Sequence, residues 1–159
     1  MGQQQVAKWA PVGQEDLLPD FTMGPATISS MDRAHRHVSD CTLGIVGLGN
    51  IGAEVALRGL AFGMRVIAVD PRQIEASEGI DWLADLERLD ELLAESDFVV
   101  VAAPHTPDTE KMFQLDRFRT MKRDAYLINI GRGAIVDLAS LVQALQQQEI
   151  AGAALDVFE

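Results

Sequence analysis

Short apolar runs alternate with segments of helical periodicity along most of the chain. Strands are predicted where an unbroken hydrophobic run is bounded by glycine, proline or polar residues, and these runs are Thr42–Gly47, Arg65–Val69, Phe98–Ala103, Tyr126–Ile130 and Ala153–Phe158. Helices are predicted between them, at Asn50–Phe62, at Leu89–Ser96, at Leu115–Met121 and after Asp137. Because hydrophobic runs without alternation are typical of strands buried on both faces, this order predicts an α/β fold with a parallel sheet.

Two of the predicted helices have well-marked apolar positions and ends. Gly63 is expected to end the first of them, because glycine favours the residue just beyond a helix. Asp137 is expected to cap the last helix, with Val136 and Leu141 in the positions of a hydrophobic staple. In the first helix Ile51, Val55, Leu60 and small residues recur at helical spacing, and in the last helix one apolar face is formed by Leu138, Leu141, Val142 and Leu145.

The first 41 residues follow neither pattern. Met1–Asp40 contains scattered proline, glycine and glutamine residues without sustained periodicity, so this stretch is predicted to be irregular. The basic cluster Arg33–His37 is interpreted as a solvated turn rather than as a metal or phosphate site. The sequence therefore predicts two parts, which are an interdomain connector or domain remnant at residues 1–41 and one folded domain at residues 42–159.

Composition restricts the classes of partner. The chain of 159 residues is 48% hydrophobic and 23% charged, with a formal net charge of -11 at pH 7. It lacks the basic footprint that nucleic acids and anionic membranes attract, so neither is expected as a partner. Cys41 is the only cysteine, which excludes an intrachain disulfide, leaves no metal site predicted and fits a reducing cytoplasm. Phe98–Ala103, the longest strongly apolar run, is too short to span a bilayer.

A glycine-rich loop joins the first predicted strand to the first predicted helix. Gly47, Gly49 and Gly52 form a G-x-G-x-x-G pattern, and Asp70 ends the next predicted strand about 20 residues after the second glycine. A strand, this loop, a helix and then an acidic residue, in that order, are the fingerprint of dinucleotide binding. The fold is therefore predicted to be a Rossmann-type doubly wound parallel sheet in a single cofactor-binding domain. A turn that serves packing only and a site for FAD remain alternatives.

Each position of this loop has a physical role in the dinucleotide interpretation. Gly47 permits a tight turn, Gly49 lets a pyrophosphate approach the backbone, and Gly52 allows the helix to pack closely on the strand. The N–H groups near Asn50 and Ile51 lie at the positive end of the helix dipole and attract the anion. The loop therefore supplies the phosphate-binding half of a cofactor site.

Asp70 is expected to accept hydrogen bonds from the hydroxyls of the adenine ribose. Since a 2′-phosphate would meet a like charge there, NAD is favoured over NADP. Arg72 opposes that preference, because a neighbouring arginine can accommodate the phosphate.

Two further loops are expected at the carboxyl ends of predicted strands, the edge at which open α/β sheets bind ligands. They are Pro104–Thr109 and Ile130–Gly133. In the second loop Arg132 lies between two glycines, where its guanidinium is accessible and can bind a carboxylate through two parallel hydrogen bonds. From this segment alone, an arginine in a flexible surface turn is an equal alternative.

These segments together resemble one family. The cofactor domain of the D-isomer-specific 2-hydroxyacid dehydrogenases contains, in the same order and spacing, stretches similar to TLGIVGLGNIG (Thr42–Gly52), AFGMRVIAVDP (Ala61–Pro71), PHTPDT (Pro104–Thr109), YLINIGRGAIVD (Tyr126–Asp137) and IAGAALDVFE (Ile150–Glu159). The resemblance implies the cofactor-binding part of an NAD-dependent oxidoreductase that acts on the CH–OH group of D-2-hydroxy acids. It also implies a homodimer.

The resemblance implies a role for individual positions. Arg132 would be the catalytic arginine, which holds the substrate carboxylate and polarises its 2-oxo group. His105 is expected to line the cofactor cleft rather than to transfer a proton. The implied cofactor contacts are Asn50 and Ile51 for the pyrophosphate, Asp70 for the ribose, Ala103 and Pro104 for the cleft wall, and Ile130, Gly131 and Asp156 for the nicotinamide side.

The family mechanism also needs a histidine for proton transfer and a glutamate that raises the pKa of that histidine. In the family pattern both follow the DVFE segment, so Glu159 is not the expected glutamate, and these 159 residues are expected to bind NAD without turning over a hydroxy acid. An NAD(H)-sensing regulatory module, as in the corepressor branch of the family, is the alternative function. A nucleotide-sugar epimerase is disfavoured, because Tyr126 is not followed by a lysine at Y-x-x-x-K spacing.

Overall fold

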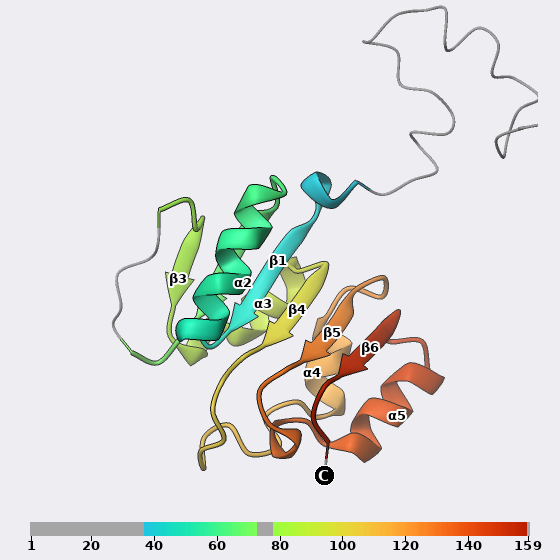
Figure 1. The fold of residues 1–159 in the computed structure, drawn as a ribbon. Helices are drawn as coiled ribbons and strands as arrows, with labels where there is room; N and C mark the ends of the chain where they lie inside the picture. Colours follow the sequence, from blue (N-terminus) through green and yellow to red (C-terminus); the bar gives the residue numbers. More distant parts are fainter. Residues whose placement is uncertain (1–36, 73–77, 159) are drawn as a thin grey trace, which may run out of the picture. The chain divides into compact units, whose positions relative to one another are not determined.

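A six-stranded parallel sheet forms the centre of the computed structural model, which describes residues 37–72 and 78–158 (Figure 1). The order across the sheet is β3-β2-β1-β4-β5-β6, and every neighbouring pair is parallel. This is the strand order of the Rossmann fold, so the predicted fold class is confirmed. The strands are β1 (Thr42–Val46), β2 (Arg65–Val69), β3 (Trp82–Ala84), β4 (Phe98–Val101), β5 (Tyr126–Asn129) and β6 (Gly152–Leu155).

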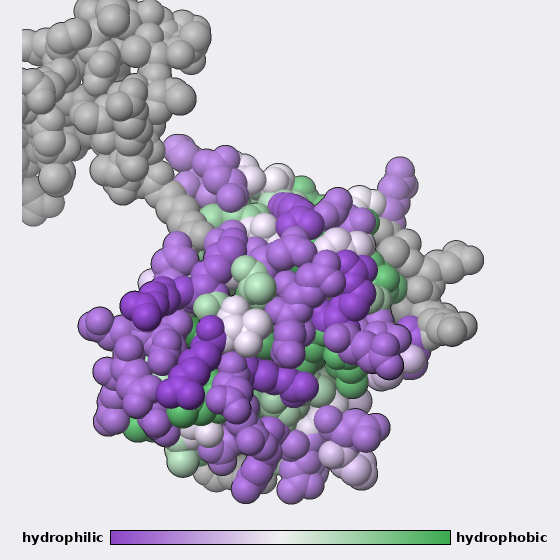
Figure 2. Space-filling view, turned by 180° about the vertical axis from the view of Figure 1, so that it is seen from behind, coloured by the Kyte–Doolittle hydropathy of each residue, from purple (hydrophilic) through white to green (hydrophobic). Residues whose placement is uncertain are grey.

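Helices cover both faces of this sheet. Successive residues of one strand therefore pack into different hydrophobic clusters. Ile45 of β1 packs in the cluster that contains Ala56 of α2, whereas Val46 packs in the cluster that contains residues of α3, α4 and α5. The surface in Figure 2 is largely hydrophilic, as expected from the charged residues that α3 and α4 carry. The helices are α2 (Asn50–Ala61), α3 (Leu89–Glu95), α4 (Leu115–Thr120) and α5 (Leu138–Gln146), with 3-10 turns η3 (Val38–Asp40), η4 (Leu86–Arg88) and η5 (Gly133–Ile135).

Strand β3 was missing from the sequence-based prediction. Its three residues, Trp82–Ala84, are too few to display either alternation or an unbroken apolar run. They pair with β2, and the carbonyl of Ala84 accepts a hydrogen bond of 2.9 Å from the N–H of Asp70. The last strand also differs from the prediction, since β6 ends at Leu155 and Phe158 lies beyond it, 74% exposed.

Of the large apolar residues whose spacing predicted α2, Val55 and Leu60 pack against the core and Ile51 does not. Helix α2 buries Gly52, Ala56 and Gly59, whereas Ile51 is 60% exposed. Small residues win this face because the helix lies very close to the sheet, and a Cβ on Gly59 would stand 2.6 Å from a methyl of Leu43. The closest contacts of α2 with the sheet are therefore made by small residues, which the prediction included only as part of the helical spacing.

In helix α5 the buried residues differ from the predicted apolar face. Leu141 and Ala144 are buried, Leu138 is half-buried, and Val142 and Leu145 are 53% and 37% exposed. The predicted face included Val142 and Leu145, which is wrong, because the helix approaches the core through the small side chain of Ala144.

The predicted helix ends are confirmed. Gly63 has φ +76°, and its N–H and that of Met64 donate to the carbonyls of Leu60 and Gly59, which is a Schellman motif. A carboxylate oxygen of Asp137 accepts a hydrogen bond of 2.9 Å from the N–H of Ser140 at the start of α5. Val136 and Leu141 are both buried there, as a hydrophobic staple requires.

The predictions for Met1–Arg36, including most of the basic cluster, lie outside the described residues, as does Glu159. Within residues 37–72 and 78–158, no helix is long and apolar enough to cross a membrane. In the same part of the chain, no group of three or more His, Cys, Asp or Glu side chains is arranged to hold a metal ion.

Candidate functional site

The glycine loop leaves the carboxyl end of β1 and is held in place by backbone contacts. Gly47 has φ +93°, and a Cβ there would stand 2.8 Å from the backbone of Ala103. A Cβ on Gly52 would stand 2.0 Å from the carbonyl oxygen of Gly47. Contacts this short cannot be relieved by turning a side chain, so glycine is required at both positions by the fold itself.

Gly49 differs from its two neighbours. It is the N-cap of α2, and the nearest atom to a Cβ on this residue would be Nη2 of Arg72, at an ordinary 3.7 Å. The protein itself therefore does not require glycine there, and the missing side chain leaves open space beside the loop. Asn50 and Ile51 follow as the first residues of α2, both exposed, where first-turn N–H groups lack partners within the helix. This combination of space and outward N–H groups suits an anion.

Asp70, the residue just after β2, is buried beside this loop. Its carboxylate accepts hydrogen bonds from the N–H of Leu48 at 2.8 Å and from the N–H of Arg72 at 2.9 Å. The Arg72 guanidinium adds two more, from Nε and Nη2, each at 2.8 Å. Hydrogen bonds from the Arg72 side chain hold the pKa of the Asp70 carboxyl below its usual range, so Asp70 is charged at neutral pH.

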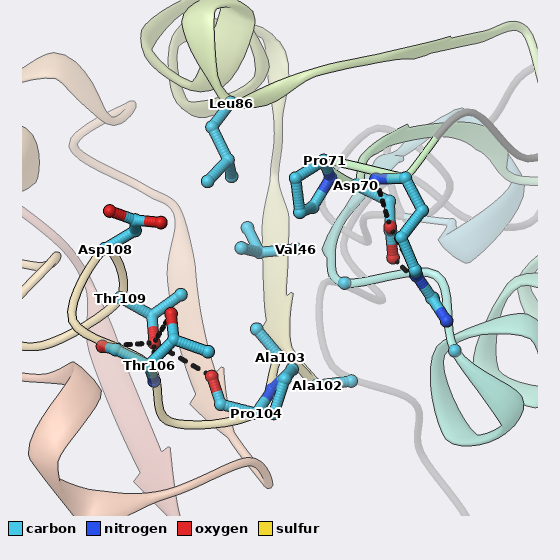
Figure 3. Close-up of a pocket in the computed structure, with 13 residues that line it drawn as sticks. Val46, Asp70, Pro71, Leu86, Ala102, Ala103, Pro104, Thr106, Asp108 and Thr109 are labelled. Carbon is cyan, nitrogen blue, oxygen red and sulfur yellow. Dashed lines mark hydrogen bonds and ion pairs between the residues drawn. The ribbon is translucent and has the colours of Figure 1, made fainter.

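A cavity of about 350 Å³ opens beside the glycine loop and Asp70 at the carboxyl edge of the sheet. That volume lies within the range of small-molecule sites. The side chains of Val46, Pro71 and Leu86 give it apolar walls (Figure 3). The lining residues are Val46, Gly47, Gly49, Asp70, Pro71, Arg72, Leu86, Ala102, Ala103, Pro104, Thr106, Asp108 and Thr109.

Five of the predicted site residues therefore meet at one cavity, and sequence reasoning missed some of the others. The predicted ones are Gly47, Gly49, Asp70, Ala103 and Pro104. Leu86 could not be found, because it follows the unpredicted strand β3. Thr106, Asp108 and Thr109 lie in the predicted ligand loop Pro104–Thr109, but no pattern distinguished them within it.

Thr109 braces the loop that forms one side of this cavity. The side chain is buried, and Oγ1 donates to the carbonyl of Pro104 and accepts from the N–H of Thr106, both at 2.8 Å (Figure 3). His105 is not among the residues that line this cavity, and its place in the cofactor cleft stays a prediction. Its side chain is 45% exposed, and Nε2 lies 3.9 Å from a carboxylate oxygen of Glu110.

The remaining predicted residues lie at the same edge of the sheet but outside the described cavity. A Cβ on Gly131 would stand 2.6 Å from the carbonyl oxygen of Ala103, so the loop after β5 touches a residue of the cavity wall. The N–H of Ile130 donates to Val101, and that of Asp156 donates to Asn129, each at 3.0 Å. The ends of β4, β5 and β6 are thereby joined side by side.

Arg132 follows Gly131 in this loop, and a buried residue fixes its backbone. Asn129 is fully buried, its Nδ2 donates to the carbonyl of Arg132 at 3.0 Å, and its Oδ1 accepts from the N–H of Gly131 at 3.1 Å. Nη1 of Arg132 donates to the carbonyl of Gly131 at 2.7 Å, and the residue is exposed. Sequence reasoning missed Asn129, although a polar residue ending an apolar strand is a usable signal.

Replacing Asn129 by alanine is expected to lower the free energy of unfolding by about 2 kcal/mol, because buried backbone groups of Gly131 and Arg132 lose their partner. Urea denaturation followed by circular dichroism measures this change. Gln143→Ala, on the exposed side of α5, serves as control and is expected to change the stability by less than about 0.5 kcal/mol. Equal stability of the two variants would contradict the bracing role.

Known proteins that resemble this chain include a family of cofactor-binding domains, in agreement with the geometry of the cavity. The sequence model of the family described as "D-isomer specific 2-hydroxyacid dehydrogenase, NAD binding domain" matches residues 22–159. Glyoxylate reductase of Thermococcus kodakarensis is 47% identical over 119 residues, which are 74% of this chain and 35% of that protein. The chain therefore spans about a third of the length of this curated relative.

Solved structures resemble the described fold closely. A D-isomer specific 2-hydroxyacid dehydrogenase from Xanthobacter autotrophicus Py2, in complex with NADPH and MES, has a TM-score of 0.74 and 34% identity, over 98% of this chain and 55% of the other. D-lactate dehydrogenase from Aquifex aeolicus, complexed with NAD and lactic acid, has a TM-score of 0.71 and 36% identity, over 91% of this chain and 42% of the other. With the family match over residues 22–159, the chain belongs to the D-isomer specific 2-hydroxyacid dehydrogenase family, as an NAD-binding domain.

Proposed function

We propose that this chain is the cofactor-binding part of an NAD-dependent oxidoreductase that acts on the CH–OH group of D-2-hydroxy acids and, in reverse, reduces 2-oxo acids. One observation carries the proposal, which is that a glycine loop with open space at Gly49 and the ionised Asp70 line the same cavity. Relatives whose names are those of dehydrogenases and reductases support an enzyme rather than a sensor.

NAD fits the described residues part by part. The open space at Gly49 and the outward N–H groups of Asn50 and Ile51 would receive the pyrophosphate. Asp70 would bind the adenine ribose, and the apolar walls of the cavity would hold the adenine. When bound, NAD supplies the hydride acceptor of the reaction.

The edge beyond the cavity would hold the nicotinamide and the substrate. Ile130, Gly131 and Asp156 would lie on the nicotinamide side, next to the cavity wall at Ala103 and Pro104. Arg132 would bind the substrate carboxylate with its guanidinium and polarise the neighbouring 2-oxo group. Asn129 would act as a positioning residue, since it holds the backbone on both sides of this arginine's peptide bond. Glyoxylate is a candidate 2-oxo acid, because it is the substrate in the name of the Thermococcus relative.

The preference for NAD over NADP follows from charge. A 2′-phosphate at the ribose would approach the Asp70 carboxylate, which is ionised and only 4% exposed. Arg72 lies close enough to offset part of that repulsion. The balance of a buried carboxylate against an exposed guanidinium favours NAD.

These 159 residues are proposed to bind the cofactor without completing the reaction. The histidines within the described part of the chain are His37 and His105, and neither lines the cavity. Neither is assigned the proton transfer, which the family resemblance gives to a histidine that follows the DVFE segment.

Isothermal titration calorimetry with NAD, paired with an NADH-oxidation assay on glyoxylate and hydroxypyruvate, tests both parts of the proposal. We expect NAD to bind and neither acid to be reduced. Absence of NAD binding would refute the cofactor site, and robust reduction of either acid would refute the lack of turnover. Light scattering after size-exclusion chromatography tests the homodimer that the family resemblance implies.

A further inference from the structure

The carboxylate of Asp70 is already supplied with four hydrogen-bond donors. Oδ1 accepts from the backbone N–H and from Nε of Arg72, at 2.9 and 2.8 Å. Oδ2 accepts from the N–H of Leu48 and from Nη2 of Arg72, both at 2.8 Å. An ionised carboxylate has about four lone-pair sites, so its acceptor capacity is filled. A ribose diol can bind to these oxygens only where a present donor leaves.

The four donors differ in how easily they can leave. The N–H of Leu48 belongs to the buried glycine loop, and the N–H of Arg72 closes a tight turn back to Asp70. Both are backbone groups and keep the carboxylate in its orientation. The Arg72 side chain is 60% exposed, so its guanidinium can move into water and be hydrated there. The two guanidinium donors are therefore the ones that a ligand can replace.

The guanidinium also occupies the path between the two halves of the cofactor site. Nη2 of Arg72 lies 3.7 Å from the point at which a Cβ on Gly49 would stand, and both residues line the cavity. In Figure 3 the hydrogen bonds of Asp70 are drawn as dashed lines, and this residue lies across from the apolar wall at Val46 and Leu86. A single atom, Nη2, is thus within contact distance of both residues, so a ligand that reaches from Gly49 to Asp70 would meet the guanidinium.

We infer that Arg72 is a displaceable competitor of the adenine ribose, whose guanidinium holds the Asp70 carboxylate until the ribose hydroxyls replace it. The inference rests on the proposed function, since it takes the ligand to carry a ribose diol. Without cofactor, the Arg72–Asp70 pair closes the ribose site. The apparent affinity for NAD is then the intrinsic affinity reduced by the fraction of molecules in which this pair is open. Arg72 thus sets how tightly the domain binds its cofactor.

The test measures NAD binding to the Arg72→Met chain by isothermal titration calorimetry. The variant is expected to bind NAD about two- to fivefold more tightly than the wild type, the range that loss of an exposed ion pair allows. Arg58→Met is the matched control, because Arg58 is an exposed arginine paired with Glu54 on α2, away from the cavity lining. It removes the same charge and is expected to change NAD affinity by less than about 1.5-fold.

Adenosine, which has no phosphate, separates competition at Asp70 from attraction of the pyrophosphate by the Arg72 charge. Titration of adenosine, followed in ¹H–¹⁵N spectra, is expected to give the same gain in Arg72→Met and a smaller gain for 2′-deoxyadenosine, which lacks one hydroxyl. Arg72→Lys keeps the charge but cannot form the paired hydrogen bonds, so it too is expected to bind adenosine more tightly than the wild type.

The outcomes separate the inference from the function on which it rests. Unchanged or weaker adenosine binding in both Arg72 variants, with NAD still bound by the wild type, overturns the competition and leaves the proposed function standing. Failure of the wild type and of both variants to bind NAD overturns the proposed function and the inference with it.

Discussion

Alanine at Gly52 is expected to lower the free energy of unfolding by about 3 kcal/mol or more, or to prevent folding. The added Cβ would stand 2.0 Å from the carbonyl oxygen of Gly47, so α2 would have to move away from the sheet. Helix propensity acts in the opposite direction, because alanine is favoured over glycine inside a helix by about 1 kcal/mol. The overlap with a backbone atom outweighs that gain. Urea denaturation followed by circular dichroism measures the difference.

Gly49→Ala is the matched control for this prediction, since it adds the same methyl group three residues earlier in the loop, where the nearest atom would be 3.7 Å distant. The free energy of unfolding is expected to fall by about 1 kcal/mol in this variant, because alanine is a poorer N-cap residue than glycine. NAD affinity is expected to fall by about tenfold or more in this variant, because the methyl group takes the space of the pyrophosphate. A Gly52→Ala chain as stable as Gly49→Ala would show that α2 is not held against the loop.

Removal of the Asp70 carboxylate is expected to weaken NAD binding by about tenfold or more, since the ribose hydroxyls lose a charged acceptor. Asp70→Ala also leaves the buried N–H of Leu48 without this partner, which is expected to cost about 1–3 kcal/mol of stability. Affinity is therefore measured by calorimetry at a temperature at which both chains are folded. Thermal shifts with NAD, NADP and NADH give the parallel measurement, in which stabilisation by NAD is expected to shrink.

Asp70→Asn distinguishes the charge from the hydrogen bond. Its amide oxygen can still accept from the N–H of Leu48, whereas the repulsion of a 2′-phosphate is removed. We expect NADP to bind this variant more tightly than it binds the wild type, while the affinity for NAD falls. Stronger stabilisation of the wild-type chain by NADP than by NAD would contradict the assigned preference.

Much of the fold could be predicted because its elements are local in sequence. Strands β1, β2, β4 and β5 are unbroken apolar runs, and the glycine loop follows the first of them directly. The parallel arrangement follows from helices between consecutive strands. The acidic residue after β2 was found by its distance from the loop, and the structure brings it to the same cavity.

The features that escaped prediction depend on contacts between distant segments. The fully buried residues of α2 are Gly52, Ala56 and Gly59, and their small size matters only because the sheet approaches so closely. Leu86 lines the cavity because it follows β3, and this short strand is held in the sheet by its pairing with β2. Nε2 of His105 lies 3.9 Å from a carboxylate oxygen of Glu110, a contact that no sequence pattern indicated.

The pairing of Arg72 with Asp70 shows the same limit at the level of side chains. The sequence placed both residues at the end of β2, where one favours NAD and the other favours NADP. Whether the two side chains act separately or bind each other depends on the geometry of the turn, which joins them through two guanidinium hydrogen bonds. Charge alone could not predict that the arginine occupies the carboxylate.

The loops after β1, β4 and β5 meet through backbone atoms, with Gly47 and Gly131 both packed against the backbone of Ala103. No side chain separates these three loops at that point, and hydrogen bonds of the Asp70, Thr109 and Asn129 side chains hold each loop in place. Leu86 lines the cavity but makes none of these hydrogen bonds, so its exchange is expected to change the shape of the cavity without moving the loops that form it. Such a frame tolerates divergence, and the same edge can be redesigned for a different ligand one wall at a time.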